Sequence, residues 1–479
     1  MIIVMIDLFE RGFAMKKSVI VYGTNSGVQK KALEVLSQIL LDATGEYPAC
    51  VSTGEYVPCP ERRPFFVGTR ENHGYIRRTS KAKLTYPEEY AITACDDTVM
   101  IEGSDDAGVL YGCVDFYNRY LTQHRLTHRS EPYFQDVFQA QLPDDFIQSH
   151  PDIRHRGLWT WGHVIYDYRG YIDNMVRLKM NTVIIWNDHV PCNAAEVVAY
   201  AHESNVKVIW GFAWLWSTNC SNVSMDMLTA ESRRIADLYE REYAHLQGDG
   251  IYFQSFTELD QEYIDGVLIA DAVTRFVNDT AALIFEKHPQ LELQFGLHAN
   301  SVSQKLAFIR NTDPRIRIVW ENCGAFPFDY LPELVANFRE TKEFVGQITR
   351  LRGNEERFGV VLKGLTKLDW GAFEHQAGPA FLGTSSRQMQ QNRLDRKKKI
   401  WHLMQAGWIV HADKAYEMIC LLRDQTEGDL HVTALVEDGM FEKKLYYPVA
   451  LLGEMLWDCG GDLTGLTYRV AMRDNVEFA

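Results

Sequence analysis

The chain has 479 residues, of which 46% are hydrophobic and 24% charged, and its formal net charge is −15. This balance predicts a folded globular protein of two or three domains and excludes an extensively disordered chain. A nucleic-acid partner is disfavoured, because the net negative charge would repel a phosphate backbone.

The nine cysteines are scattered, and none forms a Cys-x-x-Cys pair. An odd number of scattered cysteines argues against a disulfide framework and favours reduced thiols. At the N-terminus, Asp7, Glu10 and Arg11 interrupt the apolar residues, so the order of a signal peptide is missing. We therefore expect a cytoplasmic protein whose true start is Met1 or Met15, with no membrane span.

Residues 15–145 predict a small α/β domain. The expected elements, in chain order, are a strand at 17–22, a helix at 29–41, a strand at 64–67, a hairpin at 89–105 and a helix after Gly108. The turn from Gly23 to Gly27 lacks the pattern of a phosphate-binding loop and is interpreted as a plain strand-to-helix turn. Residues 143–151 are expected to be a linker.

Residues 152–410 predict a (β/α)₈ barrel, followed by a C-terminal helical region at 411–479. All eleven tryptophans lie beyond residue 150, where strand-like and helix-like segments begin to alternate. Strands are expected to end near Trp161, Asp188, Trp214, Glu258, Asn300, Asn322 and Trp370, with helices that include 171–179, 230–246 and 262–288. The best candidate for the eighth strand is GPAFLG (378–383), before a helix at 387–404. An open doubly wound sheet is the competing fold.

The candidate functional residues are the polar and aromatic side chains near these strand ends, because a barrel enzyme builds its active site there. The candidate catalytic residues are Glu258, Glu321 and Asp369. The candidate substrate-binding residues are Trp159, Trp161, Asn187, Asp188, Trp214, His298, Asn300, Trp320, Lys363, Trp370, Glu374 and His375.

Paired carboxylates among tryptophans indicate glycoside hydrolysis, which needs one carboxyl group as acid and a second as base or nucleophile. We expect Glu258 to be the acid and Glu321 or Asp369 the base or nucleophile. Tryptophan offers an apolar face for a sugar ring, and Trp320 and Trp370 each stand beside a carboxylate. Trp159, Trp186 and Trp210 could instead fill the barrel. The expected ligand is a small oligosaccharide.

Other interpretations remain open. Carboxylates at strand ends also cap helices or pair with arginine. His189, His298 and His375, with Asp188, Glu321 and Asp369, could form the metal site of a sugar isomerase or deacetylase, although no His-x-His or His-Glu-x-x-His spacing supports one. A non-catalytic carbohydrate-binding protein would keep the tryptophans alone. We expect no cofactor and no metal.

Two segments resemble a known architecture. The segment EEYAITACDDTVMIEGSDDAGVLYGCVDFYNRYL resembles the small domain that precedes the barrel in β-hexosaminidases, α-glucuronidases and O-GlcNAcases. HPDIRHRGLWTWG and YIDNMVRLKMNTVIIWND resemble the start of their barrel, including the pair Arg156-Gly157 on the first strand. The resemblance implies a glycoside hydrolase over residues 15–375.

The resemblance also bears on the mechanism. Members that use the substrate's acetamido group carry two adjacent acidic residues after the fourth strand, where this sequence has Thr257-Glu258. The α-glucuronidases place an acid glutamate there and base carboxylates on later strands, which implies those roles for Glu258, Glu321 and Asp369.

The C-terminal stretch KKLYYPVALLGEMLW (443–457) is rich in tyrosine and leucine. It could bury the surface of a homodimer or cover the barrel.

Overall fold

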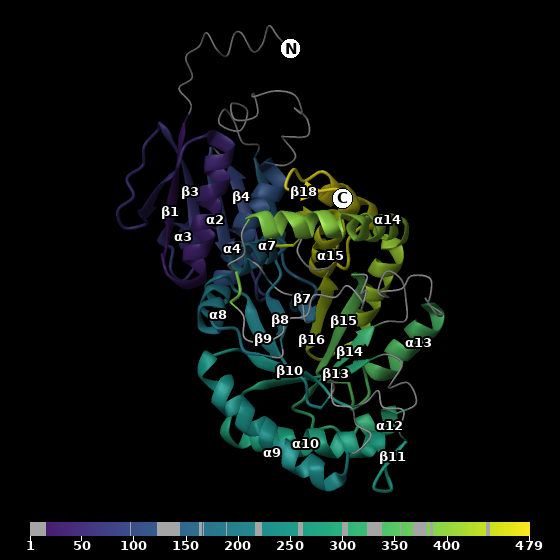
Figure 1. Ribbon diagram of the computed structural model, residues 1–479. Coiled ribbons are helices and arrows are strands. Elements are labelled where there is room, and N and C mark those ends of the chain that lie inside the picture. The colour runs from purple at the N-terminus through teal and green to yellow at the C-terminus, as the bar shows by residue number, and fades with distance from the viewer. Residues whose placement is uncertain are drawn as a thin grey trace. The chain divides into compact units, whose positions relative to one another are not determined.

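The computed structural model describes residues 16–95, 97–121, 144–161, 165, 167–187, 189–215, 223–256, 262–298, 305–322, 338–354, 356–366, 381–383, 387–436 and 441–479 (Figure 1). The chain divides into two compact units. Unit 1 consists of Met1–Pro151, Glu203–Asn205 and Ala471–Asp474. Unit 2 consists of Asp152–His202, Val206–Val470 and Asn475–Ala479.

Unit 1 contains a six-stranded sheet in the order β2-β1-β3-β5-β4-β6. Its strands are β1 (Lys17–Tyr22), β2 (Ala49–Ser52), β3 (Arg62–Thr69), β4 (Tyr90–Cys95), β5 (Thr98–Gly103) and β6 (Asp145–Ser149). Neighbouring strands are parallel except β4, which runs antiparallel to both β5 and β6. The helical segments are α2 (Gly27–Thr44), α3 (Gly74–Thr79), α4 (Asp106–Phe116) and the π-helical turn η1 (Tyr117–Leu121). The predicted hairpin is the pair β4 and β5, whereas β6 occupies part of the stretch expected to be a linker.

Unit 2 contains a closed barrel of eight parallel strands in the order β10-β13-β14-β15-β16-β7-β8-β9. The strands are β7 (His155–Trp161), β8 (Thr182–Trp186), β9 (Lys207–Gly211), β10 (Gly250–Gln254), β13 (Glu292–His298), β14 (Arg317–Asn322), β15 (Phe358–Leu365) and β16 (Leu430–Val436). The first strand, β7, pairs with the last, β16, with His155 opposite His431. The (β/α)₈ barrel predicted from the sequence is therefore confirmed, and the open sheet is not formed.

The eighth strand differs from its prediction. It is β16, which follows the long helix α14 (Arg387–Gln425), and the described part of GPAFLG (381–383) is not a strand. The barrel therefore extends beyond residue 410, into the region expected to be only helical. The length of α14 displaces the strand far from the position that regular βα spacing predicts.

Side chains that point into the barrel follow the two-residue period of each strand. In β14, Arg317, Val319 and Glu321 occupy successive inward positions from the amino end to the carboxyl end of the strand. The middle of the barrel is apolar and buried, formed by Trp159, Ile184, Trp186, Ile209, Tyr252, Val319, Val361 and Leu435. Polar side chains are therefore found at the two ends of the barrel, with this apolar layer between them.

Helices surround the barrel between its strands (Figure 1). They are α7 (Tyr168–Arg177), α8 (Ala194–Glu203), α9 (Met225–Glu242) with the short η3 (Ala244–Leu246), α10 (Ile269–Lys287), α12 (Leu306–Ile309), α13 (Phe338–Ile348), α14, α15 (Tyr447–Trp457) and α16 (Leu463–Ala471). Two small pairs of strands accompany them: β11 (Tyr263–Ile264) with β12 (Val267–Leu268), and β17 (Leu445–Tyr446) with β18 (Val476–Glu477). Within the described part of the chain, every helix is too short or too polar to cross a membrane.

The stretch that could have formed a dimer surface is α15. Every residue of this helix is buried within the single chain. A helix that is hydrophobic on all sides is expected in a protein interior. Residues 447–457 therefore pack inside unit 2, as the alternative of covering the barrel expects, and the homodimer stays a prediction.

Candidate active site at the carboxyl end of the barrel

The sequence-predicted site residues divide into two groups. The structure describes Trp159, Asn187, Trp214, His298, Trp320, Glu321 and Lys363. The side chain of Trp161 lies outside the described residues, as do Asp188, Glu258, Asn300, Asp369, Trp370, Glu374 and His375. His189 is described, but no described contact connects it with the other candidates.

Glu321 is the centre of the described site. It lies at the carboxyl end of β14, points into the barrel and is 1% exposed. The hydroxyl of Tyr252 donates a hydrogen bond to its Oε1 over 2.6 Å, and the amide of Gln254 donates to the same oxygen. The ammonium of Lys363 lies 3.0 Å from Oε2. Donors from β10 and β15 thus hold this carboxylate in one orientation.

The neighbours of Glu321 keep it ionised. Burial alone would raise the pKa of this carboxyl group, because the charged form loses its hydration. The charges of Lys363 and His298 and the hydrogen bonds from Tyr252 and Gln254 outweigh that effect and lower the pKa below its usual range. Glu321 is therefore a permanent anion at neutral pH, which suits a base or nucleophile and not a proton donor.

Lys363 is held between an anion and an aromatic face. Its side chain is 1% exposed, and its ammonium lies 4.4 Å from the centre of the Trp159 ring as well as beside Glu321. A cation over an indole ring is stabilised by the negative face of the ring, more strongly when water is excluded. The register between β15 and β16 shifts between Leu362 and Leu365, a span that includes Lys363. The Trp159 ring, which is part of the apolar layer of the barrel, therefore supports the charged pair from inside the barrel.

Two further predicted residues stand at neighbouring strand ends. His298 is the last residue of β13, lies opposite Glu321 in the strand register and is partly exposed. Asn187 follows β8 directly and is 3% exposed. Neither polar atom of the Asn187 side chain meets a hydrogen-bond partner within the described ranges. Buried polar groups are normally paired, so Asn187 is available to bond a hydroxyl group of a ligand.

Trp214 and Trp320 do not occupy the positions expected of a sugar platform. Trp320 points outward, is 2% exposed and packs against Phe344 of α13, with ring centroids 5.3 Å apart. Trp214 is fully buried and stacks on Phe253, with ring centroids 3.6 Å apart. The two-residue period explains the position of Trp320, because the neighbour of the inward-pointing Glu321 must point outward. Both rings pack against other aromatic side chains, and their contact with a sugar stays a prediction.

Tyr252 and Gln254 were missed as functional residues. Both lie on β10 and point inward to Glu321. The sequence prediction considered only residues near strand ends, and in this segment that criterion gives Glu258. The signal was present in the sequence GIYFQ (250–254), whose alternation places a tyrosine and a glutamine on one face of the strand.

Comparisons with known proteins place the fold. No family model and no curated protein matches the sequence. Among solved structures, the chain is similar to CpGH84B, a glycoside hydrolase of family GH84, with a TM-score of 0.54 and 10% identity over 96% of this chain and 71% of that one. It is also similar to a GH138 enzyme that targets pectin rhamnogalacturonan II, with a TM-score of 0.52 and 11% identity over 94% of this chain and 52% of that one.

A third similar structure is BtGH115A, a family GH115 4-O-methyl-α-glucuronidase with specificity for decorated arabinogalactans. Its TM-score is 0.51, with 12% identity over 95% of this chain and 58% of that one. The chain thus spans little more than half the length of two of the three proteins. Identities of this size establish a shared barrel architecture with glycoside hydrolases, and the architecture alone.

Proposed function

We propose that this protein hydrolyses a glycosidic bond at the carboxyl end of its barrel. The observation that carries the proposal is Glu321, a buried carboxylate held ionised where barrel enzymes place their chemistry. The fold it shares with glycoside hydrolases of three families supports the same activity.

In this proposal the two carboxyl groups have different roles. Glu258 donates a proton to the leaving oxygen, and Glu321 acts as the base or nucleophile on the other side of the sugar. Asp369 is the alternative to Glu321, because both oxygens of Glu321 already accept hydrogen bonds from protein groups. Asn187 and His298 would bind hydroxyl groups of the sugar.

The proposed substrate is a small oligosaccharide, and a uronic acid residue is favoured over an N-acetylhexosamine. Lys363 and His298 each place positive charge near Glu321 at this end of the barrel, and positive charge there suits an anionic sugar. Thr257 stands where acetamido-assisted enzymes carry the first of two acidic residues, which disfavours that mechanism. One of the similar structures is itself a glucuronidase. The cytoplasmic location stays a prediction from the sequence.

The test is hydrolysis of a panel of aryl glycosides that includes glucuronides and N-acetylglucosaminides, with the wild type and Glu258→Gln side by side. We expect turnover of a glucuronide that falls by about 10²–10⁴ in the variant, the usual contribution of general acid catalysis. A loss of less than about 100-fold in Glu258→Gln would remove Glu258 as the acid.

Wild-type protein that binds oligosaccharides but cleaves no substrate of the panel, nor any oligosaccharide, would contradict the proposed activity. It would leave a carbohydrate-binding protein.

A further inference from the structure

A second polar cluster lies at the amino end of the barrel, at the opposite end of the strands from Glu321. It contains His155, the first residue of β7, and His431 near the start of β16, which face each other across the pair that closes the barrel. Asp429 comes just before β16. The apolar middle layer of the barrel separates these side chains from the proposed hydrolytic site.

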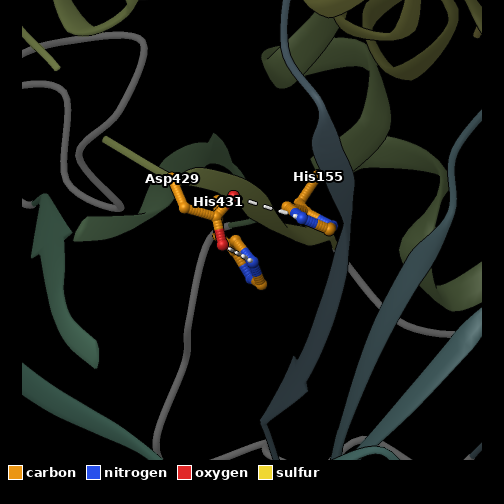
Figure 2. A group of neighbouring side chains, drawn as sticks. All are labelled: His155, Asp429 and His431. Atoms are coloured by element: carbon orange, nitrogen blue, oxygen red, sulfur yellow. Dashed lines mark ion pairs between the residues drawn. The ribbon is translucent and has the colours of Figure 1, made fainter. Parts of the chain in front are cut away.

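The three side chains converge (Figure 2). The Nε2 atom of His155 lies 3.2 Å from Oδ1 of Asp429, and Nε2 of His431 lies 3.7 Å from Oδ2. One ligand atom from each residue lies within 4.8 Å of the other two. A tetrahedral Zn²⁺ with bonds of about 2.0–2.2 Å needs ligand atoms roughly 3.3–3.6 Å apart, so the two nitrogen–oxygen separations already fit and any separation as wide as the 4.8 Å limit must shorten by about 1 Å.

Surrounding groups hold these side chains as they hold the ligands of a metal site. Arg317 donates a hydrogen bond to Oδ2 of Asp429 over 2.7 Å, which orients the carboxylate and leaves Oδ1 toward His155. Nδ1 of His431 lies 3.5 Å from Oε1 of Glu292 and 3.4 Å from the side-chain amide nitrogen of Gln294. A carboxylate behind the second ring nitrogen is the usual partner of a metal-binding histidine, because it fixes the tautomer and the ring orientation.

The charge of the cluster also favours a cation. Asp429 and Glu292 contribute two negative charges, and Arg317 compensates one of them. The Nε2 atom of His431 is buried and meets no hydrogen-bond partner among the described residues. Buried polar atoms are normally paired, and a cation between this nitrogen and the Asp429 carboxylate would supply the missing partner.

We propose that His155, His431 and Asp429 bind one Zn²⁺ ion, with water as the fourth ligand. Two imidazoles and one carboxylate form a ligand set that zinc accepts, and an open fourth position is common with three protein ligands. The Asp429 side chain is 31% exposed, which gives the ion a path from solvent. Since the ligands come from the first and last strands, the ion would tie the barrel together where it closes.

The test uses the full chain after removal of metal with a chelator and of the chelator by dialysis. Zinc binding is measured by calorimetry, and Co²⁺ is used as a visible probe of the coordination geometry. We expect one equivalent of Zn²⁺ to bind, a higher melting temperature with Zn²⁺, and the intense absorption of four-coordinate Co²⁺. Ligands that bind only the native state raise its stability in this way.

The variants His155→Asn and Asp429→Asn test the ligands. Each should weaken Zn²⁺ binding by at least about 100-fold, beyond the 10–100-fold typical of a group behind the ligands. His202→Asn is the matched control, because His202 makes a 2.8 Å pair with Asp249 that has no third ligand among the described residues. It should bind Zn²⁺ as the wild type does.

Three results would overturn the proposal. The first is wild-type protein that takes up no stoichiometric Zn²⁺, and the second is unchanged binding in both ligand variants. If neither variant folds, the wild-type Co²⁺ spectrum decides, and the weak absorption of a six-coordinate ion would contradict the site.

Discussion

Glu321 shows how neighbouring groups set the chemistry of one residue. An isolated buried carboxylate would become protonated, because its desolvation is not compensated. Lys363 supplies the compensating charge, and Tyr252 and Gln254 supply hydrogen bonds. The same contacts that keep Glu321 ionised, as a base must be, also contribute to the stability of the barrel.

Replacement of Glu321 by glutamine should therefore destabilise unit 2 at neutral pH, since the buried ammonium of Lys363 would lose the opposite charge beside it. Breaking a buried ion pair typically costs about 3–5 kcal/mol. Urea unfolding followed by tryptophan fluorescence measures this effect, because every tryptophan of the chain lies in unit 2. Equal stability of the variant and the wild type at pH 7 would contradict the assignment of a buried ion pair.

The stability difference between the wild type and Glu321→Gln should also depend on pH. The folded pKa of Glu321 lies below its ordinary value of 4.5, so its contribution to stability is present above about pH 4.5 and is lost as the pH falls through the folded pKa. The difference in unfolding free energy between wild type and Glu321→Gln should shrink in acid. A difference that stays constant from pH 7 down to pH 3 would show that the charge of Glu321 is not its cause.

At the residue scale, the sequence identified Glu321, Lys363, His298 and Asn187 because each stands near the end of a strand. It could not identify their partners, since the contact between Tyr252 and Glu321 depends on which strands become neighbours across the barrel. The sequence also places Trp320 directly beside Glu321. Consecutive residues of a strand point to opposite faces, so the Trp320 ring packs against Phe344 outside the barrel while Glu321 points into it.

At the scale of elements, a glycine on β13 makes room for the site. A Cβ atom at Gly296 would lie 2.1 Å from the hydroxyl of Tyr252 and 3.1 Å from Oε1 of Glu321. Gly296→Ala should displace that hydroxyl and remove one donor from the carboxylate. A hydrogen bond to a charged group is worth about 1.5–3 kcal/mol, so kcat should fall by roughly 10- to 100-fold.

Tyr252→Phe is the matched comparison, because it removes the same hydroxyl without adding volume. Both variants should lose a similar fraction of kcat with the glycoside identified by the panel. Full activity in Gly296→Ala together with a loss in Tyr252→Phe would show that the strands adjust, and that the glycine is not required.

A second glycine controls the approach of β7 to β8. A Cβ atom at Gly157 would lie 1.6 Å from the backbone oxygen of Thr182, its register partner. Gly157→Ala should therefore prevent correct pairing of these strands and abolish the cooperative unfolding of unit 2. Gly54→Ala in unit 1 is the control, because a Cβ there meets nothing within 4 Å. Similar unfolding midpoints for the two variants would contradict this explanation.

Seven strands could be located from the sequence because each is a short apolar run before polar residues. The eighth, β16, reads LHVTALV and has the same character, yet α14 separates it from the expected position. The regular spacing of βα units was the misleading signal.

At the scale of the molecule, the barrel has two polar ends with different expected chemistry. Removal of metal should lower the melting temperature, because the proposed zinc ion ties β7 to β16. Glycoside hydrolysis below that temperature should continue, since the proposed reaction uses carboxyl groups at the other end. The measurement is turnover and melting of the same chelator-treated sample, with and without added Zn²⁺.

Hydrolysis that stops on metal removal and returns with Zn²⁺ would contradict this division. It would instead favour metal-dependent chemistry of the kind that a sugar isomerase or deacetylase uses.

The barrel itself could be predicted from alternating strands and helices, whereas its closure could not. The hydrophobic pattern identifies each strand and helix separately. The same order of strands and helices fits both a closed barrel and an open sheet. Closure depends on the pairing of β7 with β16, which are the most distant strands of the barrel in sequence. Amino-end residues such as His155 and Asp429 were overlooked for the same reason, because their convergence exists only once the barrel is closed.

An ionised carboxylate at the carboxyl end of the barrel, Glu321, is the group that we propose for glycoside hydrolysis. The most direct measurement is kcat on the best aryl glycoside for the wild type, Glu321→Gln and Glu454→Gln. Glu454 is the matched control, because it forms another buried pair, with Lys179 at 3.4 Å, away from this end. We predict a loss of at least about 100-fold in Glu321→Gln and near-normal turnover in folded Glu454→Gln. Equal turnover in all three proteins would contradict the claim.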